Sequence, residues 1–140
     1  MSVYLDASVL AALFTVDPFS ERTDRFFRGL GAVAVVSDFG AVELASAISR
    51  HVRMRELTKD EAQQALSAFD LWAARMTSRV ETLSLDVRAA EAYLRRLDLT
   101  LRTADALNIA IAQRLGAELA TFDVRMADSA RAIGLSVTAI

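Results

Sequence analysis

The chain has 140 residues, no cysteine, one histidine and a formal net charge of −2. This length suits a single core, so we expect one domain over residues 1–140. The lack of cysteine excludes a disulfide framework, and one histidine cannot complete a structural zinc site. No apolar run approaches the roughly 20 residues of a membrane span, and the N-terminus lacks the pattern of a secretory signal. We therefore expect a cytoplasmic protein that does not contact membranes.

Short apolar runs alternate with longer segments of helical periodicity, which predicts strands separated by helices. In the first half of the chain we expect a strand at 3–5, helices at 8–16 and 20–30, a strand at 33–36, and helices at 40–53 and 58–76. In the second half we expect a strand at 82–85, helices at 86–97 and 103–115, a strand at 119–121, a helix at 124–133 and a strand at 137–138. This order favours a three-layer α/β fold, in which a parallel sheet of about five short strands is flanked by helices.

Four carboxylates lie where a charge is costly. Asp6 and Asp123 each follow an apolar strand, and Glu43 lies near the start of the helix after the second strand. Asp105 lies in a helix that is apolar almost all round, and it shares a face of that helix with Asn108. Because the carboxyl ends of parallel strands meet at one edge of a sheet, we expect these side chains to converge there.

Each acid also has a purely structural interpretation. Asp6 and Asp123 are suited to capping helices, and Glu43 and Asp105 are suited to the positive end of a helix dipole. Capping explains the positions one by one but gives no reason for four of them to meet. Four like charges at one edge repel each other unless a cation offsets them, and carboxylate oxygens favour Mg²⁺ or Mn²⁺. The pattern therefore predicts a metal site.

The charge balance outside these four acids is positive. The chain has 16 Lys and Arg against 18 Asp and Glu, so removing the four acids leaves 16 against 14. Most of the positive residues are Arg, which suits contact with phosphate. A base-composition bias toward Arg codons explains this excess equally well.

The motifs Asp6-Ala7-Ser8, Thr103-Ala104-Asp105-Ala106 and Thr121-Phe122-Asp123, together with Glu43, resemble the acidic signature of PIN domains. In order, spacing and size the chain is most similar to the small single-domain ribonuclease toxins of the VapC type. The resemblance implies an endoribonuclease that depends on Mg²⁺ or Mn²⁺ and hydrolyses RNA phosphodiester bonds. It further implies a cognate antitoxin protein as a partner, and a homodimer.

The resemblance also assigns roles to the residues. Asp6 and Asp105 would be the main metal ligands, and Glu43 and Asp123 would complete the cluster directly or through water. Ser8 and Thr121 match polar positions that support the pocket, and the helix geometry adds Asn108 to them. The alternative is a PIN-like module that binds RNA or protein without significant turnover.

The apolar surplus of two helices has two interpretations. Phe26, Phe27 and Leu30 repeat at helical spacing, and so do Leu66, Phe69 and Trp72. This spacing is typical of core residues. The resemblance implies that helices in this region also form an antitoxin groove and contribute to dimerisation, so part of this surface is expected to be an interface.

Overall fold

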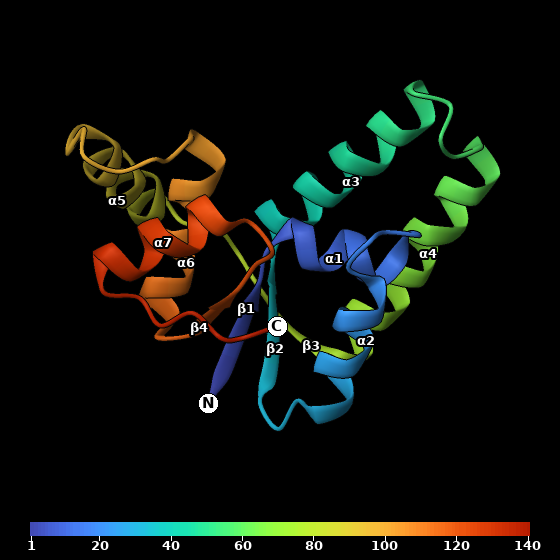
Figure 1. The fold of residues 1–140 in the computed structure, drawn as a ribbon, viewed down its shortest axis with the longest axis horizontal. Coiled ribbons are helices and arrows are strands. Elements are labelled where there is room, and N and C mark those ends of the chain that lie inside the picture. Colours follow the sequence, from blue (N-terminus) through green and yellow to red (C-terminus); the bar gives the residue numbers. More distant parts are fainter.

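Four short strands form a fully parallel sheet in the computed structural model, which describes residues 1–140 (Figure 1). The sheet order is β3-β2-β1-β4. The strands are β1 (Ser2–Leu5), β2 (Val33–Ser37), β3 (Thr77–Val80) and β4 (Glu118–Ala120). An isolated parallel bridge between Leu119 and Val137 continues the sheet beyond β4. The predicted α/β fold with about five short parallel strands is thus confirmed, except that the last strand is reduced to one bridge.

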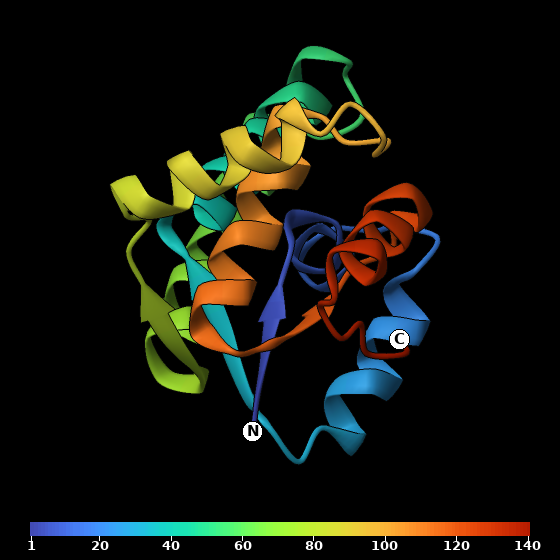
Figure 2. The same ribbon diagram turned by 90° about the vertical axis from the view of Figure 1, so that its left-hand side faces the viewer.

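Seven helices cover the two faces of the sheet. They are α1 (Ala7–Phe14), α2 (Ser20–Gly29), α3 (Asp38–Arg53), α4 (Lys59–Met76), α5 (Ser84–Arg95), α6 (Thr103–Leu115) and α7 (Val124–Ile133). Helices α1–α4 lie on one face and α5–α7 on the other (Figures 1 and 2). Because side chains alternate along a strand, β1 serves both layers. Val3 and Leu5 pack in a core with Leu44 of α3, whereas Tyr4 packs in a second core with Ile109 of α6.

The helices begin largely where the sequence predicts. The capping box at α4 is present, with the Glu61 amide donating to Thr58 Oγ1 at 3.1 Å and the Thr58 amide donating to Glu61 Oε1 at 3.2 Å. The aromatic residues of α2 and α4 belong mainly to the core. Phe69 is buried, and Trp72 packs edge-on against Phe27 with their ring centroids 5.6 Å apart.

The third strand is the main difference from the predicted elements. It is Thr77–Val80, directly after α4, and not residues 82–85. As an edge strand with partly exposed polar side chains, it lacks the apolar run that marks the other strands. Residues 83–85 turn into α5 because the Asp86 side chain accepts a hydrogen bond from the Leu83 amide at 2.8 Å. Asp86 is therefore the third residue of α5, whereas we expected the helix to begin at residue 86.

No helix in the structure combines the length and the apolar character that crossing a bilayer requires.

Candidate active site

Asp6 lies at the carboxyl end of β1, where it is almost fully buried. Its Oδ1 accepts hydrogen bonds from the amides of Ser8 and Val9 at 3.1 and 3.2 Å, which makes it the cap of α1. The Ser8 hydroxyl donates to the same oxygen at 2.6 Å, and Thr121 Oγ1 donates to Oδ2 at 2.6 Å. The structure thus joins Asp6 to Ser8 and Thr121, two of the three supporting residues suggested from the sequence, and Asp6 also caps α1.

Asn108 connects Glu43 to the buried centre of the sheet. Its Nδ2 donates to Glu43 Oε1 at 2.6 Å and to the Ala104 carbonyl oxygen at 3.0 Å. Its Oδ1 accepts from the Tyr4 hydroxyl at 2.6 Å, so the amide is fixed with its NH₂ group toward Glu43. The predicted pairing of α6 with the acidic edge is therefore made through Asn108.

Tyr4 is a site residue that sequence reasoning missed. The available signal was a tyrosine in an apolar strand, since a buried Tyr hydroxyl usually needs a partner. Its oxygen lies 2.7 Å from Ser37 Oγ, which also accepts from the Gly40 amide at 2.8 Å. A Cβ on Gly40 would lie 3.3 Å from Ser37 Oγ, so the absent side chain lets α3 start close to this pair. A buried polar chain thus runs from the start of α3 through Tyr4 to Asn108.

Asp105 and Asp123 face a shared pocket. Asp105 Oδ2 accepts from the Arg102 amide at 3.1 Å at the start of α6, and Asp123 Oδ1 accepts from the Met126 amide at 3.1 Å as the cap of α7. Both residues line a pocket of about 280 Å³, together with Arg102 and Arg125. Asp105 and Asp123 thus line one pocket, which two arginines also line.

Electrostatics link three of the four acids. Burial raises the pKa of Asp6, and the hydrogen bonds from Ser8 and Thr121 oppose that rise. Burial also raises the pKa of Glu43, the Asn108 hydrogen bond lowers it, and the negative charges of Asp6 and Asp105 raise it further. Asp6 and Asp105 are therefore close enough to Glu43 for their repulsion to be felt. A cation among them would relieve both burial and repulsion.

The donor chemistry of these residues fits a hard divalent ion. All four offer carboxylate oxygens, and no protein hydrogen bond engages Glu43 Oε2, Asp105 Oδ1 or Asp123 Oδ2. The four carboxylates are, however, too far apart in this structure to coordinate one ion together: no group of three or more Asp, Glu or His side chains is close enough to hold a metal ion. The acids surround a common edge, and ion binding requires their side chains to turn toward one another.

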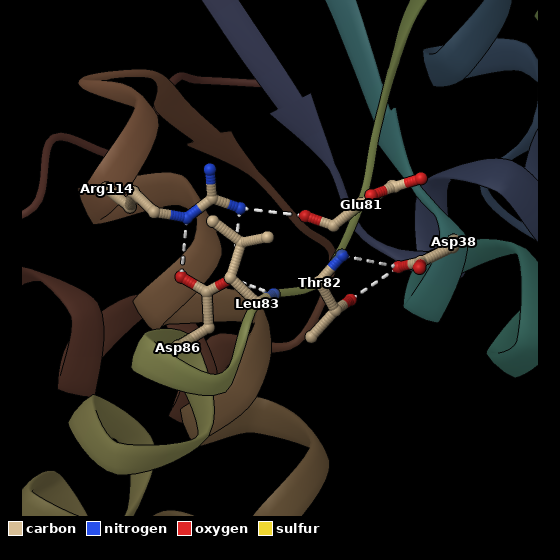
Figure 3. A network of polar contacts seen from close by, with 6 residues as sticks. All are labelled: Asp38, Glu81, Thr82, Leu83, Asp86 and Arg114. Atoms are coloured by element: carbon tan, nitrogen blue, oxygen red, sulfur yellow. Dashed lines mark hydrogen bonds and ion pairs between the residues drawn. The ribbon is translucent and has the colours of Figure 1, made fainter.

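An ion pair between the buried Asp86 and the partly exposed Arg114 fixes α6 from its other end (Figure 3). Arg114 donates from Nε and Nη2 to the two carboxylate oxygens of Asp86 at 2.7 and 2.9 Å, and from Nη2 to the Glu81 carbonyl at 2.9 Å. The Thr82 amide donates to Asp38 Oδ1 at 2.9 Å, which ties the same connection to the first turn of α3. The helices that carry Glu43, Asp105 and Asn108 are thereby held through one segment, 81–86. From the sequence we expected residue 86 only to begin a helix, so this ion pair was not predicted.

The structure therefore defines an α/β protein with an acidic site at the carboxyl edge of a parallel sheet. The chain belongs to the PIN domain family, whose profile matches residues 3–132, and this confirms the resemblance seen in the sequence. Ribonuclease VapC46 of Mycobacterium tuberculosis is 31% identical to it in an alignment 141 residues long, which covers 99% of this chain and 97% of that relative.

Solved structures share the fold over nearly the whole chain. One is Mycobacterium tuberculosis VapC20, described as a toxin that cleaves the sarcin-ricin loop, with a TM-score of 0.77, 19% identity and 99% of both chains covered. Another is a toxin–antitoxin complex from Klebsiella pneumoniae, with a TM-score of 0.59, 16% identity and 86% of both chains covered.

Proposed function

We propose that this protein is a metal-dependent endoribonuclease that hydrolyses RNA phosphodiester bonds and acts as the toxin of a toxin–antitoxin pair. The observation that carries the proposal is the placement of Asp6, Glu43 and Asp105 at the carboxyl edge of the sheet, where the negative charges of Asp6 and Asp105 contribute to the raised pKa of Glu43. Asp123 extends this cluster through the pocket that it shares with Asp105. The similarity to a relative named as a ribonuclease supports RNA as the substrate.

The proposed cofactor is Mg²⁺ or Mn²⁺. Asp6 and Asp105 would be the main ligands, and Glu43 and Asp123 would complete the site directly or through water. When bound, such an ion neutralises phosphate charge and lowers the pKa of a coordinated water. Burial supports this cofactor, because it raises the pKa of both Asp6 and Glu43 and so disfavours their charged forms in the protein alone; the negative charges of Asp6 and Asp105 add to this effect at Glu43.

The remaining residues of the site position the acids and the substrate. Ser8 and Thr121 hold the Asp6 carboxylate by direct hydrogen bonds, and Asn108 holds that of Glu43. Arg102 and Arg125 are exposed beside Asp105 and Asp123. Their guanidinium groups are suited to the phosphates that flank the cleaved bond, because arginine binds phosphate oxygens in a bidentate manner.

A cognate antitoxin protein is the proposed partner, and the active form is a homodimer in the cytoplasm. The likeness to a solved toxin–antitoxin complex supports the partner. Exposed apolar side chains on α3 and α4 offer surface for such contacts, and they include Val42, Leu71 and Met76. Growth arrest on expression, relieved by co-expression of a neighbouring antitoxin gene, tests this part of the proposal.

RNA cleavage by the purified protein tests the catalytic part. We expect cleavage with Mn²⁺ or Mg²⁺, none with EDTA, and none from Asp105→Asn. The variant should stay folded, because an Asn oxygen at this position can still accept the Arg102 amide. Asp60→Asn is the matched control, since Asp60 is an exposed acid in the first turn of α4 and should be dispensable.

Two outcomes contradict the catalytic proposal. Cleavage that survives both EDTA and Asp105→Asn would show that the acidic cluster and its ion are not responsible. RNA that is bound but stays intact with either ion would identify the alternative, a binding module without turnover.

A further inference from the structure

A second pocket adjoins the acidic edge. It measures about 380 Å³ and is lined by Phe19, Arg22, Phe122, Asp123 and Arg131, with the C-terminal segment 137–140 as one wall. Asp123 also lines the pocket that contains Asp105, so one of the four acids borders both hollows. Anything that occupies the second pocket would therefore lie next to the proposed cleavage site.

An aromatic pair forms part of this pocket. The rings of Phe19 and Phe122 are stacked, with centroids 4.3 Å apart and planes at 8°. They come from the start of α2 and from the connection between β4 and α7, so the pair joins two distant parts of the chain. Phe19 is 36% exposed, which is high for an aromatic residue that only fills a core. About a third of Phe19 is thus accessible, and it borders this pocket.

Two arginines, Arg22 and Arg131, line the pocket that holds the aromatic pair. The Arg22 guanidinium carbon lies 5.4 Å from each ring centroid, and this side chain donates to the Ile140 carbonyl. Arg131 is exposed on α7 and is engaged only by a peripheral ion pair with Asp128 at 3.3 Å. An aromatic ring with arginines beside it is suited to bind a nucleotide, which has an aromatic base and a charged phosphate. The base stacks on the ring, and its phosphates contact the guanidinium groups.

We propose that this pocket binds an unpaired base of the RNA substrate next to the cleaved bond, with Phe19 as the stacking surface. The proposal rests on the proposed function, because it names a subsite for the same substrate. A base in a duplex is already stacked on its neighbours, so the pocket selects single-stranded segments. Stacking also tolerates different bases, so the pocket would fix the position of the strand more strongly than its sequence.

Binding can be measured without cleavage by using Asp105→Asn as the parent. The probes are short fluorescent single-stranded RNAs made of A only, C only or U only, in the presence of Mg²⁺, followed by fluorescence anisotropy. We expect Phe19→Leu to weaken the best-bound probe by at least about fivefold, since it removes the aromatic face but keeps an apolar side chain. Val33→Ala is the control, because Val33 is exposed at the opposite end of the sheet and should leave binding unchanged.

Phe19→Trp supplies an independent readout. It keeps an aromatic surface, so affinity should stay within about twofold of the parent. Its new fluorescence should be quenched when RNA binds, because a base would stack on the indole. The native Trp72 packs against Phe14 and Phe27 away from the pocket, so its emission should not respond. If Phe19→Leu fails to fold, the fluorescence quenching of Phe19→Trp alone tests whether a base binds in the pocket.

The possible results separate this proposal from the proposed function. Unchanged RNA affinity in Phe19→Leu, or no quenching in Phe19→Trp, overturns the base pocket, while RNA cleavage by the wild-type protein keeps the nuclease proposal. A wild-type protein that neither binds nor cleaves RNA overturns both.

Discussion

Replacing Tyr4 with Phe tests the buried polar chain that holds Asn108. Tyr4 is fully buried, and Phe fills nearly the same volume, so the change removes one hydroxyl without opening a large cavity. Asn108 Oδ1 then loses the donor that fixes its amide, and the buried Ser37 hydroxyl loses one of its two partners but keeps the hydrogen bond from the Gly40 amide. The remaining core is untouched, so the effect reports on the polar chain itself.

The expected loss of stability in Tyr4→Phe follows from the burial of the Asn108 acceptor. An unsatisfied buried acceptor costs about 1–3 kcal/mol, and no gained contact offsets it here. For a chain of 140 residues, each kcal/mol corresponds to roughly 3 °C in Tm, so a fall of roughly 3–10 °C is expected. Asn108 should also hold Glu43 less firmly, which would reduce RNA cleavage.

Urea denaturation of the metal-free protein measures this loss. The midpoint should fall while the slope with denaturant stays the same. Tyr93→Phe is the matched control, because Tyr93 is the other tyrosine and its hydroxyl makes no protein hydrogen bond. We expect a change within about 0.5 kcal/mol for that variant. A Tyr4→Phe protein as stable as Tyr93→Phe would refute a stabilising role for the hydroxyl.

Two further variants test the electrostatics. Arg114→Ala removes the ion-pair partner of the fully buried Asp86 and should lower the free energy of unfolding by about 1–3 kcal/mol, the cost of leaving a buried acceptor unsatisfied. Arg95→Ala breaks an exposed pair on α5 and should cost less than about 0.5 kcal/mol in the same urea titration. Equal losses in the two variants would contradict the role of the Arg114–Asp86 pair. Glu43→Gln tests pH dependence: because the pKa of Glu43 is raised in the fold, its contribution favours folding at low pH and is lost as pH rises through that pKa. The metal-free variant should therefore gain stability relative to wild type as pH rises toward neutral, and a pH-independent difference in Tm would contradict this.

The sequence was most informative where an acid interrupts an apolar run. Asp6 and Asp123 follow buried strands, and parallel strands end at one edge, so their placement follows from local pattern and topology together. Asn108 was predicted from its spacing to Asp105 on α6, and the structure adds its contact with Glu43. The distances among the acids were not predictable, since they depend on side-chain directions that no spacing fixes.

Other features depend on contacts between residues far apart in the chain. Tyr4 reads as an ordinary strand residue until its partner Asn108 is known, 104 positions later. Asp86 carries the same local signal as any residue in a helix start, and only Arg114 distinguishes it. The third strand was missed because its edge position tolerates polar residues, so the alternation that identifies buried strands is absent there.

The most direct test of the account is a crystal structure of the protein with Mn²⁺, using anomalous scattering to locate the ion. The account predicts one or more anomalous peaks coordinated by Asp6 and Asp105, with Glu43 and Asp123 turned toward them. Absence of any peak at this edge, with Asp6 and Asp123 still engaged only as helix caps, would contradict it.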